Sequence, residues 1–183
     1  LKQLKFSKSH GLKKLIEGDG DKELDGDVVG FKIGPRINAA WRMDTPYKAL
    51  QLLLAWEDRL DDVLSDIEDL NAKRKTATDK FARHALANVD TEKNILIYDS
   101  SDIEHGIIGL IAWRLCEAYH KPTIALKDEW EKLVASCRSP EYFNMVGFLE
   151  KFKQYFVAFG WHKQAAGFTI LKENFDVFCK EIE

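Results

Sequence analysis

The first stretch that could do chemistry is Gly34–Arg42, which holds two arginines and an asparagine among small residues. Arg36 and Arg42 carry guanidinium groups, whose planar fork makes paired, charge-assisted hydrogen bonds to phosphate. Asn38 adds an amide between them. Two arginines in a loop are more often simply solvated, so the stretch indicates phosphate binding only together with other sites.

A second stretch, Ser136–Ser139, carries Arg138 at the end of a predicted strand, just before Pro140. Arg138 and Ser139 at a strand end can present several donors to one anion. Cys137 would need a nearby base and a lowered pKa to act as a nucleophile, and the sequence supplies neither. Arg138 and Ser139 are therefore candidates to hold an anion, and we expect Cys137 to be a small buried apolar residue.

A third stretch, Phe159–Phe168, begins with Gly160 and continues through His162 and Lys163 into an alanine-rich segment. We predict that this segment opens a short helix. Backbone N–H groups and two polar or cationic heads would then meet at a helix N-terminus, which favours an anion. A lone histidine is more often structural, so His162 gains weight only from its neighbours.

From Thr45 onward the sequence pattern is helical. Thr45 and Pro46 suit the start of a leucine-rich helix. A longer helix is predicted over Glu57–Asn88, with apolar residues at alternating spacings of three and four, acidic residues in its first turns and basic residues in its last. Periodicity alone fits a long connecting helix and a plain bundle helix equally well.

After Asn94 short apolar runs alternate with helical patterns. Strands are predicted at 95–98, 123–126, 133–136 and 168–170, and helices at 106–119, 144–155 and 173–182. We predict an α/β fold in which a long connecting helix is followed by a small mixed-sheet domain flanked by helices. The expected domains are residues 1–90 and residues 91–183.

Composition limits the function classes. The chain has 183 residues with 27 Lys+Arg against 30 Asp+Glu, and a formal net charge of -3 argues against coating of nucleic acid by bulk charge. No uncharged apolar run approaches the ~18 residues that a membrane span needs. The 3 Cys are widely spaced, which suits a reducing compartment and a cytoplasmic location.

Metal-binding patterns are weak in this sequence. It contains no CxxC, no HExxH and no zinc-like spacing. An acidic run from Asp21 to Asp27 approaches a calcium loop, but Lys32 stands where the bidentate glutamate belongs. We expect no metal site and no cofactor in this chain. Because it begins at Leu1 without a signal-like segment, we also expect a piece of a longer protein.

Taken in order, these stretches resemble RecJ-type single-strand-specific exonucleases of the DHH phosphoesterase superfamily. The family pattern runs G-P-R-I-N-A-A-G-R, a leucine-rich helix, L-N-x-x-R, a G-I-I-G helix, S-x-R-S and G-G-H-x-x-A-A-G. The matching segments here are Gly34–Arg42, Leu52–Leu54, Leu70-Asn71 with Arg74, Gly106–Gly109, Ser136–Ser139 and Gly160–Gly167. The resemblance covers essentially the whole chain.

The resemblance implies that hydrolysis and nucleic-acid binding are carried out by different domains. In that family an N-terminal DHH domain binds two Mn²⁺ or Mg²⁺ ions, which activate water for phosphodiester hydrolysis from the 5′ end of single-stranded DNA. This chain shows no D-H-H motif, so we expect no catalytic residue in it. It resembles the tail of the catalytic domain, the connecting helix and the DHH-associated C-terminal domain. The nucleic-acid-binding residues implied by the resemblance are Arg36, Asn38, Arg42, Arg138, Ser139, Gly160 and His162.

Two other functions remain open from the sequence. A related DHH phosphodiesterase for oligonucleotides or cyclic dinucleotides uses a similar C-terminal domain. From a different class, the chain could be a free-standing nucleic-acid-binding module without catalytic activity. The G-P-R-I-N-A-A stretch and the long helix favour the exonuclease branch.

The tryptophans depart from the family pattern in one consistent way. Trp41 and Trp161 stand where the pattern has glycine, and Trp113 stands where it has glycine or serine. Trp56 and Trp130 lie at predicted element junctions, where glycine is the usual residue. We hypothesise that the source organism reads UGA as glycine and that tryptophan has been supplied in its place. Five independent substitutions are the alternative.

Overall fold

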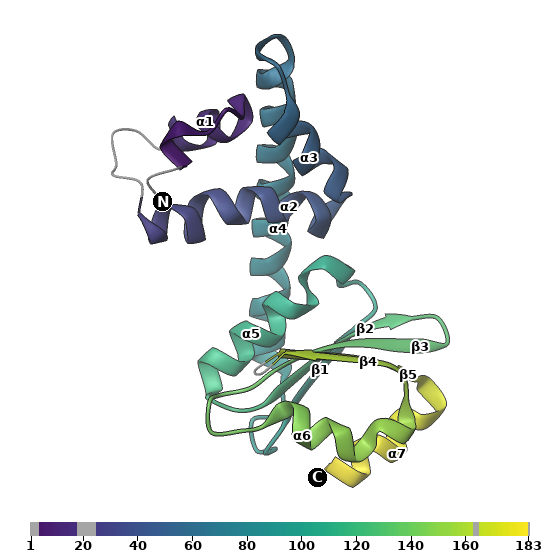
Figure 1. Ribbon diagram of the computed structural model, residues 1–183. Coiled ribbons are helices and arrows are strands. Elements are labelled where there is room, and N and C mark those ends of the chain that lie inside the picture. Colours follow the sequence, from purple (N-terminus) through teal and green to yellow (C-terminus); the bar gives the residue numbers. More distant parts are fainter. Residues whose placement is uncertain (1–3, 18–24, 163–164, 183) are drawn as a thin grey trace. The chain divides into compact units, whose positions relative to one another are not determined.

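The computed structural model describes residues 4–17, 25–162 and 165–182. The chain divides into two compact units, Leu1–Thr76 and Ala77–Glu183. Figure 1 shows helices in the first unit and a sheet with helices in the second. The boundary between the units falls inside one long helix, and our expected boundary after residue 90 stays a prediction.

The described part of the first unit is helical. Its elements are a 3-10 turn at Leu4–Phe6, α1 (His10–Glu17), a π-helical turn at Val28–Ile33, α2 (Gly34–Met43), α3 (Pro46–Leu54) and a 3-10 turn at Glu57–Arg59. The small core consists of Leu15, Val28, Ile33, Ala40, Leu52, Leu60 and Ile67. The predicted start of α3 is confirmed, because Thr45 caps the helix and Pro46 occupies its first turn.

Two expectations about the first unit change. Residues 34–42 form a helix rather than a loop, because Pro35 suits a first turn and Ala39 and Ala40 bury one helical face. The acidic run lies partly outside the described residues, including Asp21. Asp25 accepts a hydrogen bond from the backbone N–H of Val28 at 2.8 Å, as a helix cap does.

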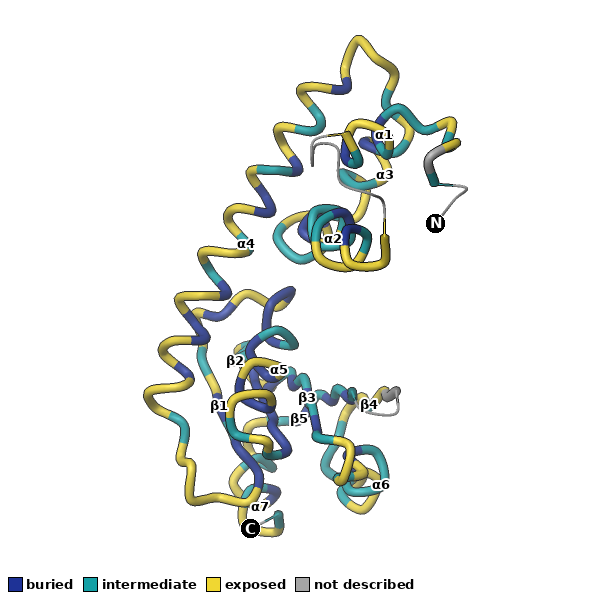
Figure 2. Tube along the Cα trace, turned by 90° about the vertical axis from the view of Figure 1, so that its left-hand side faces the viewer, coloured by how far each residue is buried: buried dark blue, intermediate teal, exposed yellow. Residues whose placement is uncertain are grey.

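The predicted long helix is confirmed as α4 (Leu60–Asn88), directly after the 3-10 turn. Its buried residues recur along one side, as Figure 2 shows. Ile67 lies in the core of the first unit, and Phe81 and Ala85 are buried in the second. This single apolar stripe is what the spacing of three and four predicts.

The second unit contains a five-stranded mixed sheet in the order β1-β2-β3-β5-β4. The strands are β1 (Leu96–Ser100), β2 (Thr123–Glu129), β3 (Lys132–Arg138), β4 (Phe156–His162) and β5 (Ala165–Leu171). β1 and β2 are parallel, and the remaining neighbours are antiparallel. The predicted α/β fold with a mixed sheet is confirmed.

Helices cover the sheet from both sides (Figure 1). α5 (Ile108–Tyr119), entered through a 3-10 turn at His105–Ile107, packs on β2 and β3. α6 (Met145–Leu149), the 3-10 turn at Glu150–Tyr155 and α7 (Lys172–Ile182) pack on the opposite face. The main core lies on that second face, where Phe178 and Met145 meet buried strand residues.

The predicted helix after Gly160 is wrong. Phe156–His162 and Ala165–Leu171 are the two strands of a β-hairpin, with Gly160 paired to Gly167. Burial alternates strictly along β5, so the segment has the two-residue period of a strand. Ala165 and Ala166, which indicated a helix, are instead residues of β5, a strand that is buried on one face only.

Candidate nucleic-acid interface

Arg138 lies at the end of β3, on the sheet face that α5 covers. The side chain is half-buried, and its Nη1 donates to Ser136 Oγ at 3.2 Å and to the backbone oxygen of Cys137 at 2.7 Å. Burial lowers the pKa of the guanidinium from its ordinary value. No carboxylate among the described residues forms an ion pair with Arg138. A half-buried cation without a counter-charge is suited to an anionic ligand.

The strand register places two other predicted residues in the row of Arg138 and in the row of Ser136 on the same strand. Arg138 is opposite Ala165, and Ala165 is opposite His162. Ser136 is opposite Gly167, and Gly167 is opposite Gly160. The structure therefore brings Arg138, Gly160 and His162 to one end of the sheet, although the side chain of His162 lies outside the described part.

The sheet face beyond Arg138 is built from small residues. Gly160 is exposed and has open space where a Cβ would stand. Gly167 and Ala165 are half-buried on the same face, because opposed residues of an antiparallel pair point to the same side. A ligand backbone could approach this floor closely, next to the guanidinium.

Ser139 and Cys137 are both buried within the fold. Ser139 is buried, and its hydroxyl donates to the backbone oxygen of Phe143 at 3.0 Å. Cys137 is fully buried on the opposite sheet face, where burial raises the pKa of its thiol strongly. The thiol is therefore unsuited to be a nucleophile, as the sequence predicts.

The three predicted residues of α2 do not converge. Arg36 forms an ion pair with Glu68, with 2.9 Å between Nε and Oε1, and its Nη1 donates to the backbone oxygen of Leu15. Asn38 and Arg42 are four residues apart and share a helix face, which Arg36 does not. The guanidinium of Arg42 lies 4.4 Å from the ring centre of Trp41, a cation–π contact.

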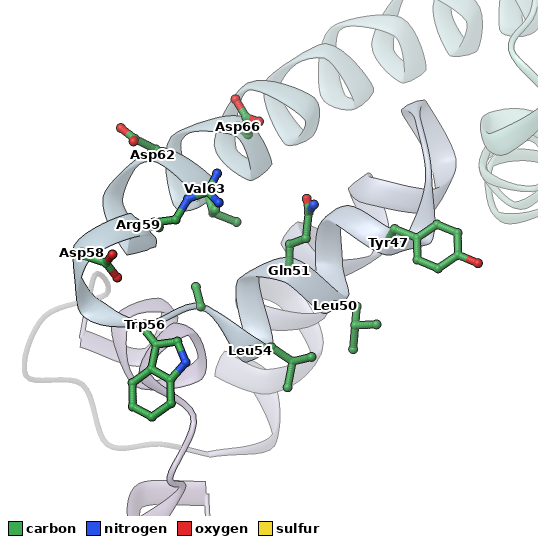
Figure 3. A pocket seen from close by; sticks show the side chains of 11 residues that line it. Tyr47, Leu50, Gln51, Leu54, Trp56, Asp58, Arg59, Asp62, Val63 and Asp66 are labelled. Carbon is green, nitrogen blue, oxygen red and sulfur yellow. The ribbon is translucent and has the colours of Figure 1, made fainter.

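The first unit also contains a cavity of about 710 Å³ between α3 and the start of α4 (Figure 3). Tyr47, Leu50 and Leu54 form its apolar side along α3, and they are exposed. The lining contributed by residues 58–66 includes three aspartates and one arginine: Asp58, Asp62, Asp66 and Arg59. Apolar carbon and excess carboxylate do not suit phosphate, so the surroundings of Arg138 in the second unit are the better candidate for an anion site.

Two residues beside Arg138, Ser136 and Gly109, lie in the motif segments but are not among the predicted site residues. Ser136 is on the same strand face as Arg138, and the two-residue period of a predicted strand could have identified it. Gly109 on α5 approaches the guanidinium, and no sequence signal links it to a residue so far along the chain. Only the packing of α5 on the sheet reveals it.

Side chains that could bind a metal ion do not gather in the described residues. These residues include no group of three or more histidine, cysteine, aspartate or glutamate side chains that could hold a metal ion. None of the described helices combines the length and the apolar character needed to cross a bilayer.

The chain is similar in sequence to known proteins. Residues 92–183 match the DHHA1 domain. The chain is similar to the single-stranded-DNA-specific exonuclease RecJ of Bacillus subtilis, with 28% identity over 182 residues, which covers 95% of this chain and 23% of the relative. The Haemophilus influenzae protein of the same name is 32% identical over 171 residues, covering 86% of this chain and 30% of the relative.

The fold of the chain is also similar to solved structures of RecJ. RecJ of Thermus thermophilus in complex with Mg²⁺ matches with a TM-score of 0.88 and 28% identity, over 99% of this chain and 29% of that one. Its complex with Mn²⁺ matches with a TM-score of 0.89. The chain thus spans between 23% and 30% of the length of the two sequence relatives.

Proposed function

This chain belongs to the DHHA1 domain family through residues 92–183, and from that premise we propose that it is the substrate-binding part of a RecJ-like 5′ to 3′ single-stranded-DNA exonuclease. The resemblance to RecJ-type exonucleases inferred from the motifs is confirmed over nearly the whole chain. In this proposal the hydrolysis is done by a DHH domain outside this chain. That domain would use Mn²⁺ or Mg²⁺, the ions in the Thermus thermophilus complexes.

One observation carries the proposed binding role. Arg138 is a half-buried cation that lacks a carboxylate partner among the described residues and stands beside a floor of glycine and alanine. Such a guanidinium binds a phosphate through paired hydrogen bonds, and the small residues let the sugar-phosphate backbone come close. Because these contacts read phosphate rather than base, the binding is expected to be independent of base sequence.

In this proposal some of the other predicted residues contact the nucleic acid, and others support the fold around these contacts. His162 extends the row that begins at Arg138, and Gly160 extends the row that begins at Ser136. Asn38 and Arg42 form a second contact on one face of α2. Arg36 and Ser139 support the fold around these contacts, because their polar atoms already bind Glu68 and Phe143.

We propose a domain division that matches these binding roles. Residues 91–183 are the nucleic-acid-binding domain, and residues 1–90 are the tail of the catalytic domain with the connecting helix. We place the full enzyme in bacterial DNA repair and recombination, in the cytoplasm. The cysteines support that location, since the buried Cys116 and Cys137 are both outside any disulfide.

Two other functions stay in view. A related DHH phosphodiesterase would prefer a short oligonucleotide or a cyclic dinucleotide to a longer strand. A non-catalytic binding module would hold DNA without any attached DHH domain. A DHH motif encoded in frame upstream of Leu1 would support the enzyme and argue against the module.

Fluorescence anisotropy tests the proposed binding role. The full chain is titrated into a labelled oligothymidylate over a range of salt concentrations. Affinity should fall with salt, with a slope of about 0.7 per neutralised phosphate of a single strand. Competition by unlabelled cyclic di-adenylate at equal concentration should be weak, whereas strong competition would favour the phosphodiesterase. Affinity that does not change with salt would remove the phosphate argument.

A further inference from the structure

The guanidinium of Arg138 is held by one of its three nitrogens. Both hydrogen bonds that it makes to described residues come from Nη1, to the hydroxyl of Ser136 and to the backbone oxygen of Cys137. The Nη2 and Nε groups make no hydrogen bond with any described residue. Since Nε and Nη2 form one edge of the planar group, this edge remains available for a bidentate anion.

Gly109 lies close to Nη2 of the guanidinium and to the hydroxyl of Ser136. A Cβ built on Gly109 would stand 3.0 Å from Nη2 of Arg138 and 3.1 Å from Oγ of Ser136. Both distances are tighter than nine in ten real Cβ contacts, so with a side chain here the guanidinium or the serine would have to shift by a few tenths of an ångström. The glycine therefore leaves the room that the present orientation of Arg138 requires.

Glycine is also a poor choice for this position on other grounds. Gly109 is the second residue of α5, and glycine is less favourable than alanine inside a helix. No positive backbone angle among the described non-glycine residues falls in α5, and Gly109 itself has no φ in the left-handed region, so the backbone does not require it. The close approach of Arg138 and Ser136 is the physical reason that remains.

We propose that Gly109 and Ser136 are positioning residues that orient Arg138 toward the anion. Ser136 accepts a hydrogen bond from Nη1 and fixes the plane of the guanidinium, and Gly109 leaves space for Nη2. The inference rests on the proposed function, because it assigns roles at the same phosphate site. It adds that affinity depends on the orientation of the arginine as well as on its charge.

The test compares affinity and stability in the full chain. Gly109→Ala keeps the charge of Arg138 and improves helix propensity, so the melting temperature should not fall. Affinity for a labelled oligothymidylate should nevertheless fall about tenfold, as expected when one charge-assisted hydrogen bond is lost. The slope of affinity against salt should stay unchanged, because no phosphate contact loses its cation.

Ser136→Ala is the second variant, and it should weaken binding in the same way. Gly30→Ala is the matched control, because a Cβ on Gly30 meets nothing within 4 Å. Its affinity should equal that of the parent chain.

The decisive experiment introduces each of the two substitutions, Gly109→Ala and Ser136→Ala, separately into a chain that already carries Arg138→Ala. If Gly109 and Ser136 act through Arg138, neither substitution weakens binding further in that background. Equal losses with and without Arg138 would overturn the positioning role, as would unchanged affinity in both single variants. If Arg138→Ala itself leaves affinity unchanged, the proposed phosphate site fails, which is a different result from failure of the positioning role.

Discussion

Cys137 and Arg138 are adjacent in β3, and their side chains leave opposite faces of the sheet. Cys137 is fully buried in the main core, whereas Arg138 is half-buried on the α5 side and faces Gly109. The buried thiol and the cation that could bind an anion thus lie on opposite faces of the same strand. The two-residue period of the strand is the cause.

The Cys137 thiol should resist alkylation in the folded protein. Burial raises its pKa, so the reactive thiolate does not form at neutral or mildly alkaline pH. Cys179 is only half-buried and should be alkylated sooner. Mass spectrometry after timed exposure to iodoacetamide measures both rates, and rapid labelling of Cys137 in the native state would contradict the prediction.

Stability should also depend on alkaline pH through Cys137. The folded pKa is raised, so the unfolded chain releases this proton first, at a pH near its ordinary value of about 8.5. The stabilisation is present below that pH and is lost as the pH rises above it. Urea unfolding of Cys137→Ala alongside the parent chain should show a smaller alkaline decline in the variant, and parallel declines would speak against the effect.

Replacement of Trp130 by glycine should stabilise the protein by about 1 kcal/mol. Trp130 has a φ of 55° and is the first of two residues that link β2 to β3. A two-residue hairpin turn with positive φ at its first position normally takes glycine there. The indole is 89% exposed and gains little by packing. The free energy of unfolding in urea measures the gain.

Trp56→Gly is the control for this prediction. Trp56 is also exposed, at 75%, but its φ of -85° suits any residue, so glycine should bring no gain. Equal stabilisation by both substitutions would show that removal of an exposed indole is the cause. The native gene tests the wider hypothesis, because ordinary UGG codons at all five tryptophan positions would reject UGA reassignment.

Thr78→Val should keep or raise stability. Thr78 is 5% exposed within α4, and its hydroxyl has no hydrogen-bond partner among the described residues. Valine has the same shape without the unsatisfied polar atom, so the gain should be about 1 kcal/mol. Thr78→Ser keeps the hydroxyl and loses a methyl group, so it should lower the melting temperature. The prediction fails if valine costs as much as serine.

Gly11→Ala should destabilise the first unit by about 1–3 kcal/mol. A Cβ on Gly11 would overlap the backbone oxygen of Leu52, where α1 packs on α3. Backbone atoms cannot turn aside as a flexible side chain can. Thermal unfolding of this variant beside Gly30→Ala, which has open space, separates the clash from a general effect of alanine.

Local patterns in the sequence determined most of the elements. The cap at Thr45, the stripe along α4 and the apolar runs of β1, β2 and β3 depend on neighbours within a few residues. These interactions are local, so they can be identified from spacing. The same holds for Arg138 as a candidate, since its position at a strand end follows from the chain alone.

Only the tertiary structure decided how the candidates are used. The strand pairing turned the predicted helix after Gly160 into a hairpin and aligned Gly160 and His162 with the rows of β3. The packing of α5 brought Gly109 against Arg138, and an ion pair with Glu68 engaged Arg36. These contacts join residues distant in the chain, and which of them form depends on how whole elements pack. The sequence thus identified candidate groups for phosphate binding, and the packing determined that the guanidinium of Arg138 keeps donors that no described residue accepts.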